Sequence, residues 1–305
     1  LAQSIIRQVV NLAWQQMTEK YGEPDYADIP NEQHDMLSRG FAVIGYGKLG
    51  GYELGYGSDL DLVFLHNCTS RAATNGPKSI ESGLFYLKLA QRILHLFNTK
   101  TASGHLYEVD MRLRPSGNAG LLVCHIDGFS EYQNQTAWTW EHQALTRARF
   151  IVGSPSLAQE FSVVRHQILS QKRDIKPLQE SVAQMREKMR KHLGSSSKAG
   201  FDLKQDSGGI ADIEFIVQYY VLAYSCEYPA LSKWPDNVRI LQQLQASKLL
   251  GEQDTQILND AYLTYRNTNH RLVLQQSEQP PDGDQFIQLR EGVSRIWQQL
   301  FTMQS

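Results

Sequence analysis

Residues 41–65, FAVIGYGKLGGYELGYGSDLDLVFL, constrain the fold of this chain more than any other stretch. An apolar run at 41–44 stops at a glycine-rich segment, and a second apolar run follows that carries Asp59 and Asp61. Alternate residues of a β-strand lie on one face, so we expect these two carboxylates to share a face with Val63 and Leu65. The pattern predicts a strand, a glycine-rich loop and a second, acidic strand.

The two carboxylates suit a divalent cation. We expect Asp59 and Asp61 to lie roughly 6 to 7 Å apart at their Cα atoms, and Mg²⁺ binds carboxylate oxygens while substrate phosphates complete its coordination. Backbone N–H groups around Gly57 and Ser58 are candidates to hold a triphosphate. Lys48 is a candidate counter-charge, and a solvated loop lysine explains it equally well. The sequence therefore predicts a site for a metal ion and a nucleotide.

The glycines permit a second interpretation. Gly45, Gly47 and Gly50 spell the G-x-G-x-x-G fingerprint of dinucleotide-binding folds. That motif requires a helix directly after the turn, whereas the following residues, GYELGYGS, are rich in glycine and lead into another β-like run. A loop is therefore favoured over a helix. The residues around Lys48 also fail the phosphate-loop pattern G-x-x-x-x-G-K-[ST].

Residues 105–115, HLYEVDMRLRP, predict a third strand in which apolar and charged residues alternate. Its charged face consists of Glu108, Asp110, Arg112 and Arg114. If this strand lies beside the acidic strand, Asp110 completes a carboxylate triad of the kind that holds two metal ions, and the arginines are available for phosphate oxygens. An exposed sheet face with cross-strand ion pairs is the alternative.

The rest of the chain is predominantly helical in its pattern. Periodicity predicts helices at 4–21 and 79–98, a strand at 121–126, and helical structure over 127–149, where Arg149 is a candidate for phosphate binding or for bracing the active site. A Gly-Ser-Pro sequence at 153–155 predicts a domain boundary. A helix that starts near Pro177 has a basic face, which we interpret as solvated or as a docking surface for an acidic partner. That face consists of Arg186, Lys188, Arg190 and Lys191.

Length and composition set the broad class. A chain of 305 residues favours two domains. Hydrophobic residues at 41%, charged residues at 20% and a net charge of −2 are typical of a globular protein with no global attraction to nucleic acid or membranes. Three scattered cysteines lack disulfide or metal-site spacing, which predicts a reducing cytoplasm. Because the chain begins at Leu1 inside an expected helix, we expect a fragment of a longer polypeptide.

Several motifs carry a family resemblance. A glycine pair at 50–51, followed by DLDL at 59–62, resembles the nucleotidyltransferases related to DNA polymerase β. The longer string GYGKLGGYELGYGSDLDLVFLH, together with EVDMRLRPSG, WTWEHQALTRAR and KQDSGGIADIEF, resembles the glutamine synthetase adenylyltransferase family. The resemblance implies an α+β fold. A polymerase-β-like nucleotidyltransferase domain with a mixed sheet and flanking helices is expected at 1–153, and an all-helical bundle domain at 154–305.

The resemblance also implies an activity. Enzymes of that family are bifunctional: one half transfers AMP from ATP to a tyrosine hydroxyl of glutamine synthetase, and the other half removes it by phosphorolysis. YEVDMRLRPSGNAGLLV and AWTWEHQALTRAR resemble the C-terminal, adenylylating half. The implied cofactor is Mg²⁺ and the implied co-substrate is ATP. Glutamine synthetase is the implied protein partner, and the PII signal protein and glutamine are the implied regulators, with no nucleic acid and no membrane.

Other functions stay open at this point. The same motifs serve phosphorolytic removal of AMP by the other half of the enzyme. A nucleotidyltransferase fold retained as a non-catalytic nucleotide sensor is an alternative from a different class. Nucleic-acid polymerisation or tRNA nucleotide addition is weaker, because the sequence has no concentrated basic surface with interleaved aromatic residues.

The expected site residues follow from the motif matches. By resemblance, Asp59 and Asp61 match the family's metal-binding pair and Asp110 matches its third carboxylate, so all three are expected to be catalytic and metal-binding. The expected nucleotide-binding residues are Lys48, Gly50, Gly51, Gly57, Ser58, Arg112 and Arg149. In the GGIADIEF motif, Asp212 and Glu214 have a structural explanation, because acids in the first turn of a helix complement its dipole.

Overall fold

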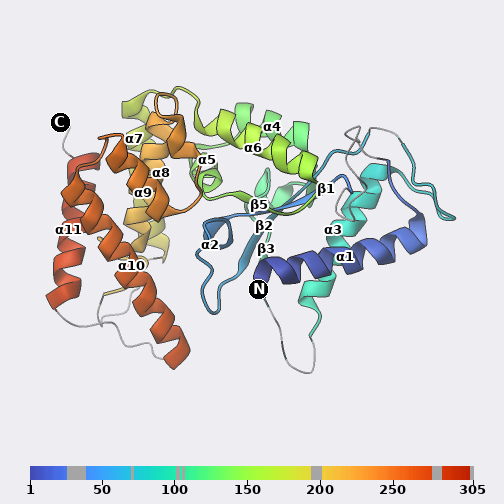
Figure 1. Ribbon diagram of the computed structural model, residues 1–305, viewed down its shortest axis with the longest axis horizontal. Coiled ribbons are helices and arrows are strands. Elements are labelled where there is room, and N and C mark those ends of the chain that lie inside the picture. The colour runs from blue at the N-terminus through green and yellow to red at the C-terminus, as the bar shows by residue number, and fades with distance from the viewer. Residues whose placement is uncertain are drawn as a thin grey trace. The chain divides into compact units, whose positions relative to one another are not determined.

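The computed structural model describes residues 1–25, 39–69, 72–100, 104, 107–193, 201–276 and 284–302. The chain divides into two compact units (Figure 1). The first comprises Leu1–Leu54, Ser58–Ala137 and Arg147–Ile168, and the second comprises Gly55–Gly57, Trp138–Thr146 and Leu169–Ser305. The predicted fold class, a mixed sheet with helices followed by a helical region, is confirmed. The units do not divide at 153/154, because helix α6 (Pro155–Leu169) packs almost entirely with the first unit.

A five-stranded mixed sheet lies at the centre of the first unit. Its strands are β1 (Phe41–Gly45), β2 (Leu60–His66), β3 (Val109–Asp110), β4 (Val123–His125) and β5 (Arg149–Gly153). The order is β3-β2-β1-β5, and β4 also pairs with β2. Strand β1 is antiparallel to β2 and β5, whereas β2 is parallel to β3 and β4. Strand β3 pairs with the start of β2 and β4 with its end, so the first residues of β2 lie beside β3.

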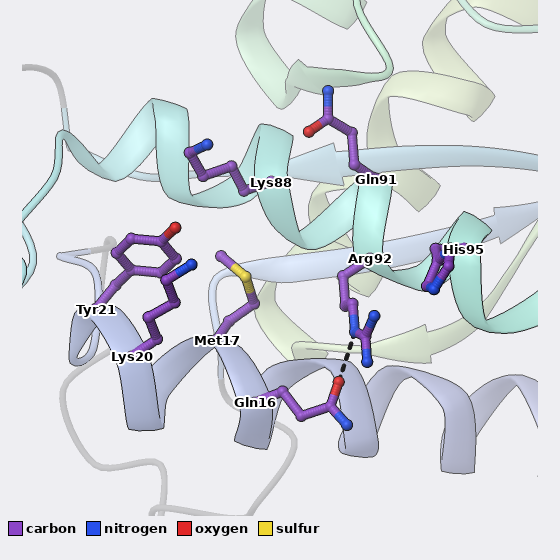
Figure 2. Close-up of a pocket in the computed structure, with 8 residues that line it drawn as sticks. All are labelled: Gln16, Met17, Lys20, Tyr21, Lys88, Gln91, Arg92 and His95. Carbon is purple, nitrogen blue, oxygen red and sulfur yellow. Dashed lines mark hydrogen bonds between the residues drawn. The ribbon is translucent and has the colours of Figure 1, made fainter.

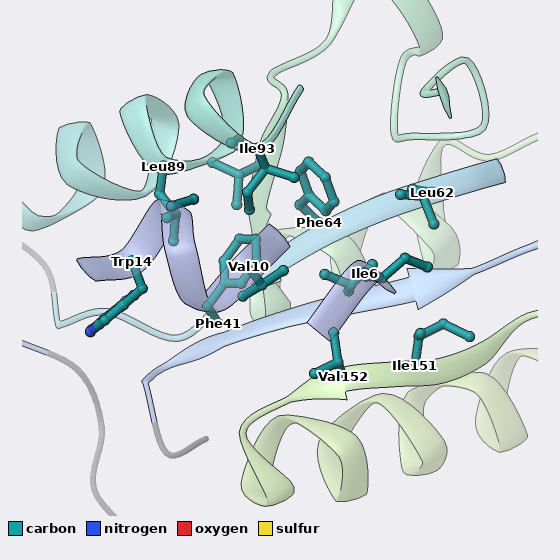
Figure 3. Close-up of a cluster of buried hydrophobic side chains, with 14 of the residues drawn as sticks. Ile6, Val10, Trp14, Phe41, Leu62, Phe64, Leu89, Ile93, Ile151 and Val152 are labelled. Atoms are coloured by element: carbon teal, nitrogen blue, oxygen red, sulfur yellow. The ribbon is translucent and has the colours of Figure 1, made fainter. Parts of the chain in front are cut away.

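Two amphipathic helices, α1 (Ala2–Tyr21) and α3 (Ser82–Asn98), pack against the sheet (Figure 3). The buried cluster that they share with the strands includes Ile6, Val10, Trp14, Phe41, Leu62, Phe64, Leu89, Ile93, Ile151 and Val152. Full burial of each such side chain stabilises the fold by roughly 1.5 to 3 kcal/mol. Leu60, Leu62 and Phe64 all belong to this cluster, so the predicted alternation of β2 is confirmed. Asp61 alternates with these residues along β2, so it belongs to the other face of the strand.

Three further elements complete the first unit. Helix α4 (Ile126–Gln135) contacts β2 and β4. A single helical turn, α2 (Gly47–Gly50), follows β1, and a short 3₁₀ turn, η1 (Gly117–Ala119), follows β3. The predicted preference for a loop over a long helix after β1 is therefore confirmed, and the dinucleotide-binding interpretation is wrong, because no long helix opens on the glycines and β2 returns antiparallel to β1.

The second unit is helical. Its helices are α5 (Thr139–Thr146), α7 (Ile175–Leu193), α8 (Ile210–Tyr224), α9 (Asn237–Ala246), α10 (Glu252–Gln275) and α11 (Asp284–Phe301), with a 3₁₀ turn, η2 (Pro229–Ser232). Helix α8 contacts all five other helices. It is buried on most sides, as expected of a helix that other helices enclose. Within the described ranges, no helix is both long and apolar enough to cross a bilayer.

The third strand is much shorter than its alternating pattern predicts. Strand β3 ends at Asp110, whose carboxylate accepts a hydrogen bond from the backbone N–H of Arg112 (2.8 Å). Asp side chains favour such turns, so the chain folds back instead of continuing. Arg114, expected on the charged face, is buried, and its Nη1 donates to the Met111 carbonyl (2.8 Å). The expected strand positions His105 and Leu106 lie outside the described residues.

The helical prediction for 127–149 is correct only as far as Thr146. Helices α4 and α5 account for most of it, but Arg149 begins β5, which pairs with β1. A short apolar run such as RFIVG is compatible with either structure by periodicity. Pairing with β1, more than 100 residues earlier in the chain, decides in favour of a strand. The predicted strand at 121–126 is confirmed as β4.

The basic face on α7 is not a solvated surface as a whole. Arg186 is fully buried, and its Nε donates to Asp212 Oδ1 (2.6 Å). Arg190 Nη2 donates to the same oxygen (3.2 Å). Only Lys188 and Lys191 are exposed as predicted. Asp212 in α8 therefore has a structural role, as expected, but through a buried charge cluster in addition to the helix dipole.

Candidate active site

The start of β2 places two of the predicted carboxylates side by side. Asp61 is the register partner of Asp110 across the parallel β2–β3 pair, and the Leu60 N–H donates to the Glu108 carbonyl (2.8 Å). Asp59 lies one residue before β2 and is exposed. The predicted adjacency of the two acidic segments is therefore present, although β3 is only two residues long.

Electrostatics set these carboxylates apart from ordinary surface acids. Burial, together with the neighbouring charges of Asp110 and Asp59, raises the pKa of Asp61 to about 6. The pKa of Asp110 is lowered, chiefly because Arg112 donates hydrogen bonds to it, with Nε 2.7 Å from Oδ2. The Arg112 side chain is 74% exposed, so it can exchange this contact for a ligand. The result is a cluster of negative charge that Arg112 and Arg147 compensate in part.

The donor set fits a metal ion that a substrate helps to bind. Among the described residues, no three His, Cys, Asp or Glu side chains are arranged as a ready-made metal site. Mg²⁺, however, is often held by only one or two carboxylates together with substrate phosphates and water. Asp61 and Asp110 provide such a pair. Burial and the repulsion from Asp110 and Asp59 raise the Asp61 pKa, and a cation at this position would relieve that repulsion.

Gly47 is a site residue that the sequence analysis missed. Its backbone lies against the Asp61 carboxylate: a Cβ at this position would lie 2.4 Å from Asp61 Oδ2, and its φ of +54° is in the left-handed region. The Tyr46 N–H donates to the Asp61 carbonyl (2.9 Å), which fixes the turn to β2. The signal was present in the sequence, because Gly47 is the second glycine of the rejected dinucleotide fingerprint.

We call residues 47–51 the glycine turn. A buried ion pair supports this turn. Arg147 and Glu53 form a salt bridge in which both side chains are 5% exposed. Gly50 packs on the Arg147 carbonyl, where a Cβ would lie at 1.9 Å, and Gly51 packs on the Arg147 guanidinium, where a Cβ would lie 3.0 Å from Nη2. Both glycines therefore allow close approach of Arg147. This pair was also absent from the predicted site.

The remaining predicted nucleotide-binding residues are placed unequally. Arg149 Nε donates to the Gly50 carbonyl (3.0 Å), Nη2 donates to the Leu49 carbonyl (3.2 Å), and the guanidinium lies over the Tyr52 ring at 4.0 Å. These contacts hold the segment 49–52 and occupy donors that a phosphate would need, so the predicted role of Arg149, phosphate binding or bracing, stays a prediction. Burial lowers the Arg149 pKa.

The side chains of Lys48 and Ser58 lie close to each other. Lys48 Nζ lies 3.3 Å from Ser58 Oγ, and Ser58 is buried while Lys48 is exposed. Gly57 has a φ of +66°, and the atom nearest to an added Cβ is a methyl carbon of Val273 (3.9 Å). By its contacts Gly57 belongs to the second unit, whereas Ser58 belongs to the first.

We predict that Arg147→Met lowers the free energy of unfolding by roughly 3 kcal/mol, because it leaves the buried Glu53 carboxylate without its counter-charge. Urea denaturation measures the change. In the matched control, Arg112→Met, the removed arginine pairs with Asp110 from an exposed position, and we expect a loss below about 1 kcal/mol. A double variant, Glu53→Leu with Arg147→Met, should recover much of the loss. Equal losses in the two single variants would show that the buried pair is unimportant.

Two protein-family models match the chain. The model described as Glutamate-ammonia ligase adenylyltransferase matches residues 1–164. The model described as GlnD PII-uridylyltransferase matches residues 176–281. The first match covers more than half of the 305 residues and contains the sheet, Gly47, Asp61 and Asp110. The second match lies within the helical unit.

Proposed function

Because the chain belongs to the glutamate-ammonia ligase adenylyltransferase family, we propose that it transfers AMP from ATP to a tyrosine hydroxyl of glutamine synthetase, the other name of glutamate-ammonia ligase. The observation that supports this most is the pairing of Asp61 with Asp110 in adjacent strands. Nucleotidyl transfer uses carboxylates that hold Mg²⁺ against the phosphates. The first unit supplies such a pair next to a glycine turn. The proposed setting is the cytoplasm.

In this mechanism the tyrosine oxygen attacks the α-phosphorus in line. A new O–P bond forms, the bond from the α-phosphorus to the bridging oxygen breaks, and pyrophosphate leaves. Bound Mg²⁺ would neutralise phosphate charge and orient the triphosphate. Asp61 and Asp110 would hold the ion, with Asp59, the exposed residue before β2, as a third ligand. Because Arg112 keeps Asp110 ionised, Asp110 is available as a ligand or as the acceptor of the tyrosine proton.

The glycine turn has two proposed tasks. The backbone N–H group of Ser58 would bind a triphosphate oxygen, and Lys48, whose Nζ lies 3.3 Å from Ser58 Oγ, would supply a positive charge beside it. Gly47 keeps the Asp61 carboxylate in place by leaving room for it. Arg149, Gly50 and Gly51 act one step away from the nucleotide, since their contacts are with the turn itself.

The direction of the reaction and the regulators are proposed on separate grounds. The adenylylating direction rests on the resemblance of YEVDMRLRPSGNAGLLV and AWTWEHQALTRAR to that half of the family. The similarity of residues 176–281 to a family described by PII uridylylation supports the PII signal protein as a regulatory partner. Glutamine, the second regulator, follows from the family resemblance alone.

A transfer assay tests the proposal. The chain is incubated with unmodified glutamine synthetase, Mg²⁺ and ATP labelled at the α-phosphate, and label on the synthetase is followed. We expect label with the wild-type chain, none above background with Asp110→Asn, and an unchanged rate with Asp260→Asn, which removes an exposed carboxylate in α10 that accepts hydrogen bonds from Gln256.

Two other outcomes have defined meanings. If the synthetase stays unlabelled while adenylylated synthetase and phosphate release ADP, the chain is the adenylyl-removing half. If neither reaction occurs and the chain also fails to bind Mg-ATP, the proposed catalytic function is wrong.

A further inference from the structure

A groove runs between the C-terminal half of α1 and the middle of α3, both in the first unit (Figure 2). We call it the α1–α3 groove. Its volume is about 540 Å³, and its walls come in equal parts from the two helices. Ligand-binding pockets commonly have volumes of roughly 300 to 1,000 Å³. The groove shares no residue with the carboxylate site, so it needs an explanation of its own.

The lining of the α1–α3 groove is cationic. Lys20 from α1 and Lys88 and Arg92 from α3 carry permanent positive charges, and His95 lies one turn beyond Arg92. None of the lining residues is acidic. Glu19, next to Lys20 in sequence, lies outside the lining and accepts a hydrogen bond from Gln15 (3.0 Å). Three cations from two helices therefore face one space without a carboxylate among them.

The positive charges around the groove affect the hydroxyl of Tyr21. Its pKa is lowered, first by a hydrogen bond from Lys20 and then by the charges of Lys20, Lys88 and Lys78. The Lys20 ammonium also lies over the Tyr21 ring, 5.0 Å from its centroid. Charges from both helices thus act on one hydroxyl at the edge of the groove.

The guanidinium of Arg92 is pre-positioned. Its Nε donates to Gln16 Oε1 (2.5 Å), a contact between α3 and α1 that is drawn in Figure 2. Among the described residues, neither Nη group of Arg92 has a hydrogen-bond partner, so both can bind a ligand. A guanidinium held in this way matches carboxylate and phosphate oxygens in a two-pronged geometry. Solvated lysines on one helix face would require neither this fixed arginine nor convergence from a second helix.

We propose that the α1–α3 groove binds a small anion that carries at least two carboxylate or phosphate groups. Lys20 and Lys88 neutralise one group, and Arg92 holds the other together with the amide of Gln16. Such a ligand bridges α1 and α3, the two helices that cover the sheet. Because it would bind only where these helices are packed together, it would stabilise the first unit.

Calorimetric titration of the whole chain, in buffer without Mg²⁺, tests the proposal with citrate as the polycarboxylate and 2,3-bisphosphoglycerate as the bisphosphate. We expect one saturable site for at least one probe, and the probe that binds identifies the preferred group. Lys88→Gln and Arg92→Gln should each weaken binding about tenfold, as expected for the loss of one charge-assisted contact. Arg7→Gln, which removes an exposed positive charge elsewhere on α1, should leave the affinity within about twofold.

Lys88→Gln separates an effect on ligand binding from an effect on folding. No hydrogen bond or ion pair of Lys88 is present in the described part of the chain, so this variant should melt like wild type without ligand, whereas Arg92→Gln also breaks the contact to Gln16. The wild-type melting temperature should rise with the bound probe. Absence of saturable binding to both probes, or equal weakening by Arg7→Gln, would overturn the proposal.

Discussion

Asp61→Asn is expected to lower the rate of AMP transfer roughly 10³-fold and, at the same time, to make the folded first unit more stable. The rate falls because an amide cannot replace a carboxylate that faces a metal ion and its bound phosphates. Stability rises because the ionised carboxylate is unfavourable in the folded chain. Burial and the charges of Asp110 and Asp59 raise its pKa from 3.8 to about 6.

The sign of the stability effect follows from proton linkage. Between the unfolded pKa of 3.8 and the folded pKa of about 6, the folded chain binds more protons at Asp61 than the unfolded chain does. The contribution of the Asp61 carboxyl to the free energy of unfolding is therefore fully present below pH 3.8 and is lost as pH rises through about 6. A shift of this size corresponds to roughly 3 kcal/mol at most, so we expect Asp61→Asn to gain about 1 to 3 kcal/mol near neutral pH.

Urea denaturation in the presence of a chelator measures this gain, and the transfer assay measures the rate. The gain should be present at about pH 8 and should disappear below about pH 3, where the wild-type carboxyl is protonated in both states. Asp260→Asn should change neither quantity. An Asp61→Asn variant that is less stable than wild type at both pH values would mean that Asp61 serves the fold and not a ligand.

Gly47→Ala is expected to lower the transfer rate by about 10² to 10³-fold while leaving a folded protein. Its Cβ would lie 2.4 Å from Asp61 Oδ2, and the carboxylate is the part of the contact that can move. The side chain of Asp61 therefore rotates away from Asp110, and the pair is lost. The left-handed φ of +54° adds strain of roughly 1 to 2 kcal/mol for any residue with a Cβ.

Gly83→Ala provides the matched control. Gly83 lies in α3, and among the described residues no atom beyond its chain neighbours and the surrounding helix backbone comes within 4 Å of a Cβ added there. This variant should retain full activity and gain up to about 1 kcal/mol, because alanine favours a helix over glycine. Steady-state rates and urea denaturation of the two variants separate the local effect of Gly47 from the general effect of adding a methyl group. Full activity in Gly47→Ala would contradict the positioning role of Gly47.

Local pattern was sufficient for much of the fold. The alternation that sets Leu62 and Phe64 in the core and Asp61 in the other set of positions is a property of seven consecutive residues, and the structure has it. Helices α1 and α3 likewise follow from apolar periodicity within each segment. These elements were predictable because each one buries a stripe that its own sequence defines.

Contacts between distant segments were not predictable in the same way. Glu53 and Arg147 are 94 residues apart, and neither has a local pattern that announces a buried ion pair. Arg186 was assigned to a solvated face because α7 alone places it among lysines, whereas Asp212 on another helix buries it. The early end of β3 depends on one side chain, Asp110, which bonds to the backbone two residues ahead.

The most direct test of the central claim is metal and nucleotide binding at the Asp61–Asp110 pair, without any protein substrate. Mn²⁺ replaces Mg²⁺, and the loss of its free electron paramagnetic resonance signal is titrated in the presence of a non-hydrolysable ATP analogue. We predict that the wild-type chain binds the metal–nucleotide complex and that Asp61→Asn and Asp110→Asn each weaken this binding at least about tenfold. Wild-type affinity in both asparagine variants would contradict the account, because the metal and the nucleotide would then bind elsewhere.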